Sequence, residues 1–165
     1  MMSAYVFSIA LDLALNGRDS GVANLKKIAP REVPANKLNF QLEFLALTMA
    51  PFTSELQMRY DRDVADGITR GAVDRLTEFC QEHMTKKADP IDWVTVPVKI
   101  SNSVHFYANQ LTGISQVEDL IRLSRIATER LLGKPDPFLG AAIADHVTRS
   151  VQFARNFLTA IPLAG

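Results

Sequence analysis

The feature that most constrains the fold is a long repeat of apolar residues between Pro51 and Met84. Their spacing of three and four residues is that of one apolar face of an α-helix. The residues that keep this spacing are Leu56, Tyr60, Val64, Ile68, Ala72, Leu76 and Phe79. Proline is costly inside a helix, and Thr53 or Ser54 can cap a helix start. The pattern therefore predicts a break at Pro51, followed by one long helix to Met84 around which the rest of the chain packs.

Two glycines interrupt this segment. Gly67 and Gly71 lie four residues apart, so they fall on one side of the predicted helix. Each costs about 1 kcal/mol relative to alanine in a helix interior. Either they admit the close approach of another backbone, or they divide the segment into two helices.

Two charged residues lie on the apolar face of the same segment. A buried charge without a partner is costly, so Asp61 and Arg75 must each have a partner, reach solvent or belong to a site. About 21 Å of helical rise separates them, so they cannot pair with each other. We therefore take both as candidate ligand-binding residues, with the partnered or peripheral interpretation left open.

The remaining patterns predict a chain that is helical almost throughout. Cap and stop signals place further helices at about residues 3–16, 20–29, 37–50, 101–113, 116–132 and 138–161. The fold class is therefore an all-α bundle of about six or seven helices, in a single domain of residues 1–165. We expect the long helix, the helix opened by a Ser115–Glu118 capping box and the helix after Pro137 to form its centre.

The predicted helix at residues 37–50 is apolar over much of its circumference. Its apolar residues are Leu38, Leu42, Phe44, Leu45, Leu47 and Met49. Such a helix is either central or covered by a partner, because a large exposed apolar surface usually marks an interface. We therefore expect a homodimer.

Residues 91–100 follow a different pattern. Val94, Val96, Val98 and Ile100 alternate with other residues, and β-branched residues at a period of two are typical of a strand. Pro97 restricts such a segment to an edge or an extended strap. We predict a strap laid across the bundle with Trp93 filling a gap, and the alternative is an edge that pairs with another chain.

Composition restricts the class of protein. The 165 residues are 47% hydrophobic and 22% charged, with a net charge of zero, which fits a globular domain and argues against a generally basic nucleic-acid binder. No stretch approaches the roughly 18 apolar residues of a membrane span. The apolar stretch at 4–15 lacks the preceding basic residues of a signal peptide. With Cys80 as the single cysteine, we expect a cytoplasmic protein that does not contact a membrane.

Few residues suggest metal binding or catalysis. Cys80 and His83 lie one helical turn apart beside Glu78 and Glu82, a spacing that metal ligands can use. A lone cysteine beside an apolar stripe is, however, more often a packed hydrophobic residue. We predict no metal site and no cofactor. Without a nucleophile at a strained turn or a glycine-rich phosphate loop, the chain is more typical of a non-enzyme.

Residues 112–132 loosely match a helix-turn-helix motif. A capped first helix would precede a second one bearing Arg125 and Arg130. Against this, one unbroken helix fits the apolar spacing better. The segment is also nearly neutral, and phosphate contacts normally supply much of the affinity for DNA.

Three functions follow from these patterns. The first is a non-enzymatic interaction or regulatory protein that acts through protein–protein contacts, with itself or with another protein. The second is a small-molecule or metal-binding bundle, which could be an enzyme, with inward polar groups that converge in one cavity. The third is a DNA-binding regulator acting through residues 112–132. The candidate ligand-binding residues are Asp61, Arg75, Trp93 and His105.

Overall fold

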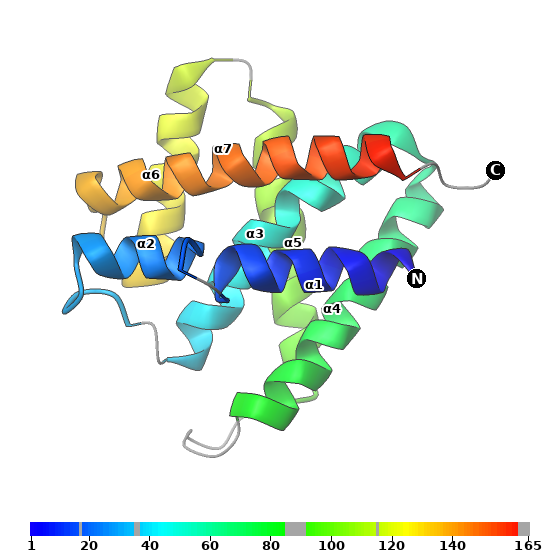
Figure 1. The fold of residues 1–165 in the computed structure, drawn as a ribbon, viewed down its shortest axis with the longest axis horizontal. Helices are drawn as coiled ribbons and strands as arrows, with labels where there is room; N and C mark the ends of the chain where they lie inside the picture. The colour runs from blue at the N-terminus through cyan, green and yellow to red at the C-terminus, as the bar shows by residue number, and fades with distance from the viewer. Residues whose placement is uncertain (17, 35–36, 85–91, 115, 162–165) are drawn as a thin grey trace.

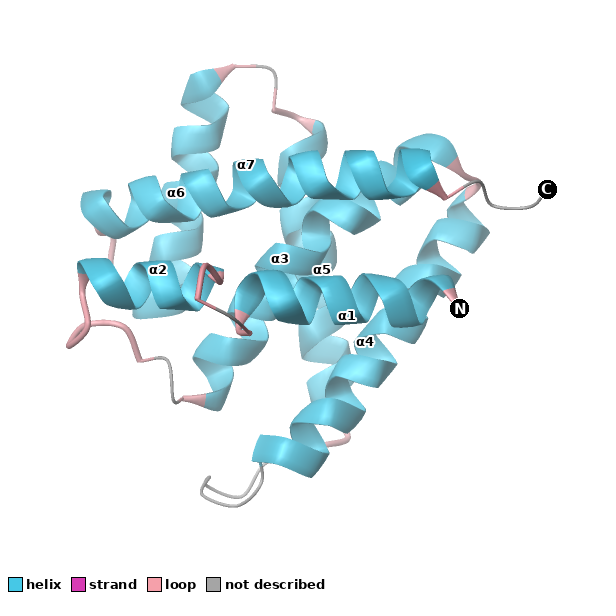
Figure 2. Cartoon of the chain, viewed as in Figure 1, coloured by secondary structure: helices cyan, strands magenta, loops and turns pink. Residues whose placement is uncertain are grey.

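The computed structural model describes residues 1–16, 18–34, 37–84, 92–114 and 116–161. Within them the chain forms seven α-helices and no strands, so the predicted all-α bundle is confirmed (Figure 2). The helices are α1 (Met2–Ala14), α2 (Gly21–Ile28), α3 (Leu38–Arg59), α4 (Arg62–Met84), α5 (Val96–Thr112), α6 (Val117–Leu132) and α7 (Pro137–Ala160). No helix of the described residues is long and apolar enough to cross a membrane.

Helix α3 is the centre of the bundle. It packs against α1, α4, α5, α6 and α7, and in Figure 1 it lies between α1 and α7 on the near side and α5 behind. Every residue from Phe44 to Leu56 is buried, because neighbours surround this helix on all sides. The prediction that the helices after Pro51, Ser115 and Pro137 form the centre is therefore wrong.

The predicted break at Pro51 is also wrong. Helix α3 continues through Pro51 to Arg59, and the chain turns instead at Tyr60, whose backbone is extended. Proline removes one backbone hydrogen bond, but the apolar side chains on both sides of Pro51 are buried, and their burial outweighs that loss. Thr53 does not cap a helix: its hydroxyl lies 3.0 Å from that of Thr69 and joins α3 to α4 inside the core.

The extended strap at 91–100 is not formed. Residues 93–95 form a turn, α5 begins at Val96, and residue 91 lies outside the described residues. Pro97 stands in the first turn of α5, where the missing N–H of proline costs nothing and its fixed φ favours the helix. Val96, Ile100 and Val104 are buried and lie four residues apart, which is helical spacing. The alternating valines that suggested a strand therefore belong to a helix. Trp93 is half-buried against the core, as expected.

Of the two glycines of α4, one permits a close helix crossing. A Cβ atom built on Gly71 would lie 2.6 Å from the Ser3 hydroxyl, so α1 and α4 approach closely there. Gly67 has open space around it. Helix α4 is unbroken at both positions, so the close-approach interpretation is confirmed for Gly71.

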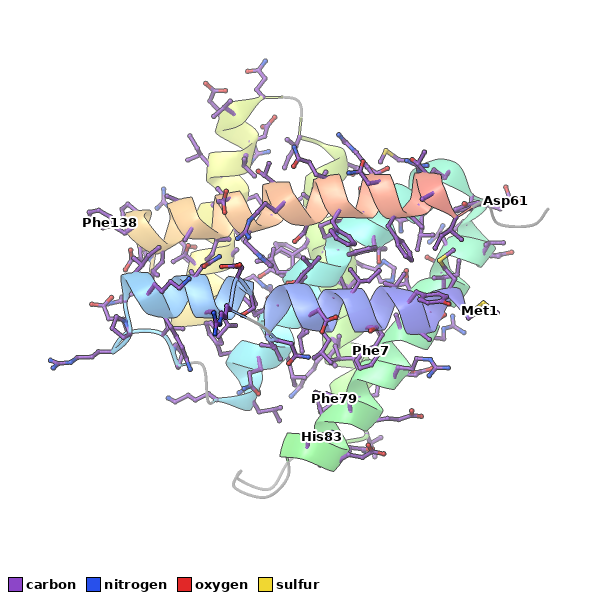
Figure 3. All side chains as sticks on the ribbon, in the orientation of Figure 1. Met1, Phe7, Asp61, Phe79, His83 and Phe138 are labelled. Carbon is purple, nitrogen blue, oxygen red and sulfur yellow. The ribbon has the colours of Figure 1, made fainter. Side chains whose placement is uncertain are left out.

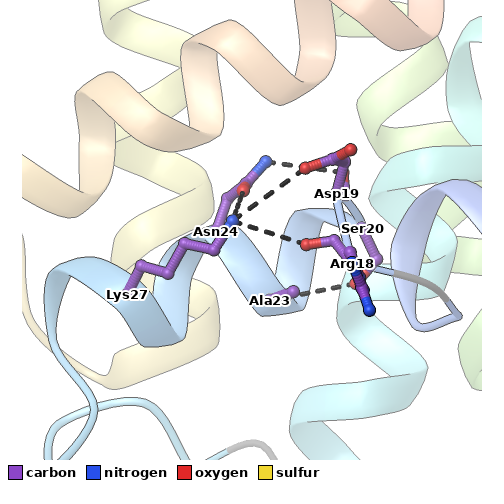
Figure 4. A network of polar contacts seen from close by, with 6 residues as sticks. All are labelled: Arg18, Asp19, Ser20, Ala23, Asn24 and Lys27. Atoms are coloured by element: carbon purple, nitrogen blue, oxygen red, sulfur yellow. Dashed lines mark hydrogen bonds and ion pairs between the residues drawn. The ribbon is translucent and has the colours of Figure 1, made fainter.

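The ends of α2 and α6 follow the cap signals closely. The Ser20 hydroxyl accepts a hydrogen bond from the backbone N–H of Ala23 at 3.2 Å and starts α2, as predicted (Figure 4). The Lys27 ammonium group reaches back to this end of α2, 3.9 Å from the Asp19 carboxylate. Gln116 and Asp119 form the capping box of α6, whereas the predicted cap Ser115 lies outside the described residues. Gly133 ends α6 in the left-handed conformation, at φ 74°.

Candidate binding site

Glu55 is a buried carboxylate on α3 that is held by two arginines. Its side chain is 7% exposed. One carboxylate oxygen accepts a hydrogen bond from Nε of Arg155 on α7 at 2.6 Å, and the other lies 3.5 Å from Nε of Arg59. Arg59 also donates to the hydroxyl of Thr159 at 3.1 Å. The cluster fastens the C-terminal ends of α3 and α7, and it contains two positive charges for one negative charge.

A cavity of about 590 Å³ opens beside this cluster. Glu55 and Arg155 are its charged lining residues, and the rest of the wall is mostly apolar. The wall includes Pro51 and Met58 of α3, Leu111 of α5, Ile114 between α5 and α6, Val117 and Leu120 at the start of α6, and Val147 and Val151 of α7. Small-molecule sites are typically hollows of about 300–1,000 Å³ with apolar walls and a few polar groups. We call this hollow the α3–α7 cavity.

A second hollow lies where α6 turns into α7. Its volume is about 420 Å³, and it is lined by Ile121, Ser124, Arg125, Pro135, Asp136, Pro137, Gly140, Ala141 and Ala144. The small residues of α7 leave this space open, since they present little side chain to α6. Ile121, which lines it, is 63% exposed, and Phe138, the residue after the lining residue Pro137, is 80% exposed. We call this surface the α6–α7 corner, and Phe138 marks its outer end in Figure 3.

A second glutamate of α3 is the centre of a closed polar cluster. Glu43 accepts hydrogen bonds from the hydroxyls of Ser103 (2.8 Å) and Tyr107 (2.6 Å) on α5 and from Nε of Arg130 on α6 (2.5 Å). Arg130 also donates to Ser103 at 2.9 Å and lies over the ring of Phe106. Burial, followed by the charge of Glu43, raises the pKa of Tyr107 above its ordinary value of 10.0. The hydrogen bond to Glu43 raises the pKa of Arg130. This cluster joins three helices.

His146 is part of the core. Its Nε2 lies 2.8 Å from the hydroxyl of Thr48, and its ring stacks on Phe44 with 4.8 Å between centroids. The Thr48 hydroxyl donates its proton to the carbonyl of Phe44, which assigns the hydrogen in the other contact to Nε2. Burial lowers the pKa of His146 to about 4, with a smaller contribution from the charge of Arg149. The imidazole is therefore neutral near pH 7.

The four candidate ligand-binding residues line neither of these two cavities. Asp61 is exposed at the turn into α4, at the opposite end of the molecule from Phe138 (Figure 3). Arg75 is exposed on α4. Trp93 is half-buried just before α5, and His105 is half-buried within α5. Convergence of these residues on one ligand stays a prediction that no contact in the described residues supports.

Cys80 and His83 lie in different environments. Cys80 is fully buried, and burial raises the pKa of its thiol to about 12. His83 is exposed, with its ring stacked on Phe79 and its Nδ1 3.0 Å from the carbonyl oxygen of Phe79 (Figure 3). Among the described residues, no three metal-binding side chains come together. The thiol therefore behaves as a packed apolar group.

The segment that loosely matches a helix-turn-helix contains one helix, not two. From Val117 to Leu132 the chain is the unbroken α6. Its three arginines each have an acidic partner: Arg122 has Asp119, Arg125 has Glu129 and Arg130 has Glu43. The second, base-reading helix that this motif requires is absent from the described part of residues 112–132.

Glu43 and Glu55 are the residues that sequence reasoning missed. They are the two acidic residues of α3, and both lie within an otherwise strongly apolar stretch. The argument that drew attention to Asp61 and Arg75, a charge among apolar residues, applies to them with more force. Treating Pro51 as a break hid this, because it placed the two glutamates on different helices.

Comparisons of this chain with models of protein families, with curated proteins and with solved structures find no match.

Proposed function

We propose that this protein is a non-enzymatic interaction protein that acts through protein–protein contacts, with a second copy of the chain bound at the α6–α7 corner. The observation that supports this most strongly is the exposure of Ile121, which lines an apolar hollow, together with the exposure of Phe138 next to the lining residue Pro137. Large exposed apolar side chains that gather around a hollow are typical of interaction surfaces.

The charged groups of the corner already have partners within the chain. The Asp136 carboxylate accepts hydrogen bonds from the backbone N–H groups of Phe138 and Leu139 and caps α7. Arg125 lies 3.3 Å from the carboxylate of Glu129. A partner therefore meets a surface whose apolar part can be buried without stripping water from an unpaired charge.

The corner carries both a projecting side chain and a recess, which favours self-association. In a twofold dimer the same patch must supply both sides of the contact. Phe138 of one copy and the hollow beside Pro137 and Ala141 of the other form such a pair. The helix at 37–50, first expected to form the dimer, is buried within the protomer from residue 44 onward, so the exposed corner is the better candidate for this contact.

Sedimentation velocity over a range of protein concentrations, with native mass spectrometry, tests this proposal. We expect a dimer in the unchanged protein and a monomer in the Ile121→Lys variant, because the lysine places a charge in the apolar contact. Val98→Lys is the matched control, since Val98 is also an exposed apolar residue on a helix but lies on α5, away from the corner. A monomer at every concentration, or a dimer that survives Ile121→Lys, would overturn the proposal.

A further inference from the structure

We propose that the α3–α7 cavity binds an amphipathic monocarboxylate, with its apolar chain in the hollow and its carboxylate on the guanidinium of Arg155. This goes beyond the proposed dimer and uses different residues. Three observations carry it: the shape and lining of the cavity, the excess of positive charge at one end of it, and the way in which Glu55 holds Arg155.

The apolar part of the ligand is set by the wall of the cavity. Leu111 lies in the last turn of α5, Ile114 follows that helix, and Leu120 lies near the start of α6. Val147 and Val151 come from α7. Water against this apolar part of the wall has few hydrogen-bond partners, so an alkyl chain that displaces it there gains free energy. The roughly 590 Å³ of space suits a small molecule, not a helix of a partner protein.

The charge of the ligand is set by the cluster at the α3 and α7 end of the cavity. Glu55 supplies one negative charge, and Arg59 and Arg155 supply two positive charges, so the cluster carries a net positive charge. Among the described residues, no other charged side chain lines the cavity. An anionic group therefore binds there more favourably than a cationic one.

Glu55 acts as a positioning residue for Arg155. Its carboxylate accepts a hydrogen bond from Nε of Arg155 at 2.6 Å. This uses one of the five N–H donors of the guanidinium. The arginine side chain is 61% exposed, so donors on its outer nitrogens remain accessible. A ligand carboxylate can accept two parallel hydrogen bonds from a guanidinium, a geometry that an ammonium group does not offer.

Isothermal titration calorimetry with decanoate, below the concentration at which it forms micelles, tests the proposal. We expect saturable binding of one decanoate per chain, with no detectable binding of acetate and weaker binding of decanol and decylammonium. Arg155→Gln should weaken the binding of decanoate at least about tenfold, since it removes a charge-assisted hydrogen bond. Arg149→Gln, on the same helix but outside the cavity, should leave it unchanged.

Filling the cavity gives a second test that does not depend on the arginine. Gln152 lines the cavity and is exposed, so Gln152→Trp places a large ring in the space with little effect on the core, and it should abolish binding. Ile121→Lys should bind decanoate as the unchanged protein does, which separates this site from the proposed dimer. The proposal is overturned if decanoate does not bind, if decylammonium binds as tightly, or if neither Arg155→Gln nor Gln152→Trp weakens binding.

Discussion

The two glutamates of α3 show how the same side chain can fasten a fold in one place and border a cavity in another. Glu43 accepts hydrogen bonds from two buried hydroxyls on α5 and from Arg130, whose guanidinium lies over aromatic rings. Glu55 is more deeply buried, yet its two partners are arginines, one of them mostly exposed, and a cavity adjoins it. Burial of the carboxylate therefore does not distinguish the two clusters, whereas the two buried hydroxyl donors, present only around Glu43, do.

The difference has a physical cause. A donor such as the Tyr107 hydroxyl has no access to water, so losing its acceptor leaves it unsatisfied. An exposed arginine can turn to water or to another anion when its acceptor is lost. The cluster around Glu43 is thus fixed by the fold, and the cluster around Glu55 can share a partner with a ligand.

Glu43→Ala should cause the largest loss of stability. The change leaves the buried Tyr107 hydroxyl and the Ser103 hydroxyl without their acceptor, and it removes the partner of Arg130. We expect the free energy of unfolding to fall by about 3–4 kcal/mol, with a small share from the partly exposed Arg130. Urea unfolding measures this. Asn39→Ala, an exposed position one turn earlier on α3, is the control, and a loss under about 1 kcal/mol for Glu43→Ala would contradict the comparison.

The contact between Thr48 of α3 and the neutral His146 should make the stability of the protein depend on pH. The unfolded chain binds a proton at His146 near its ordinary pKa of 6.5, whereas the folded protein does so only near pH 4. The free energy of unfolding should therefore fall as the pH drops from about 6.5 to about 4, by about 3 kcal/mol, and this contribution should stay constant below that. His146→Phe should remove this part of the pH dependence in thermal or urea unfolding, and equal slopes in the two proteins would show that His146 is not its source.

Much of the fold was predictable because local signals agree with the packing. The starts and ends of α2, α6 and α7 lie within a residue or two of the predictions, since Ser20, Gly133 and Pro137 have one plausible role each. The start of α5 and the continuity of α3 were not predictable. From Val96 onward, apolar residues fit both the spacing of a strand and the spacing of a helix. At Pro51, burial of the neighbouring side chains outweighs the local cost of proline in a helix.

The candidate site was far less predictable because its contacts join distant parts of the chain. Glu55 meets Arg155, a hundred positions later, and Glu43 meets Arg130, 87 positions later. A single sequence shows that a charge lies among apolar residues, but not which charge from another helix reaches it. Asp61 and Arg75 satisfied the same criterion and are exposed at the surface. Asp61 lies in the turn between α3 and α4, and Arg75 lies on a side of α4 that no other helix of the described residues covers.

Replacing the arginine partner of each glutamate by lysine tests the same comparison between the two clusters. Arg130 uses its Nε and one outer nitrogen for separate partners and lies over two aromatic rings, and lysine cannot reproduce this arrangement. Arg130→Lys should therefore lower the free energy of unfolding by about 1–2 kcal/mol. Arg155→Lys should lower it by less than about 0.5 kcal/mol, because its side chain is mostly exposed. Equal losses in urea unfolding would remove the distinction between the two clusters.

Glu55→Gln should have the smallest effect on stability and the most informative effect on binding. The amide oxygen of glutamine can still accept from Arg155, and both arginines have access to water, so we expect a loss of about 0.5–1 kcal/mol in the free energy of unfolding. The change raises the net positive charge beside the α3–α7 cavity by one. Decanoate should therefore bind a few times more tightly in calorimetry, with a gain that shrinks as salt is added. If Glu55 only held the fold together, Glu55→Gln would lower the stability strongly and would not tighten the binding of decanoate. That result would give Glu55 the same structural role as Glu43.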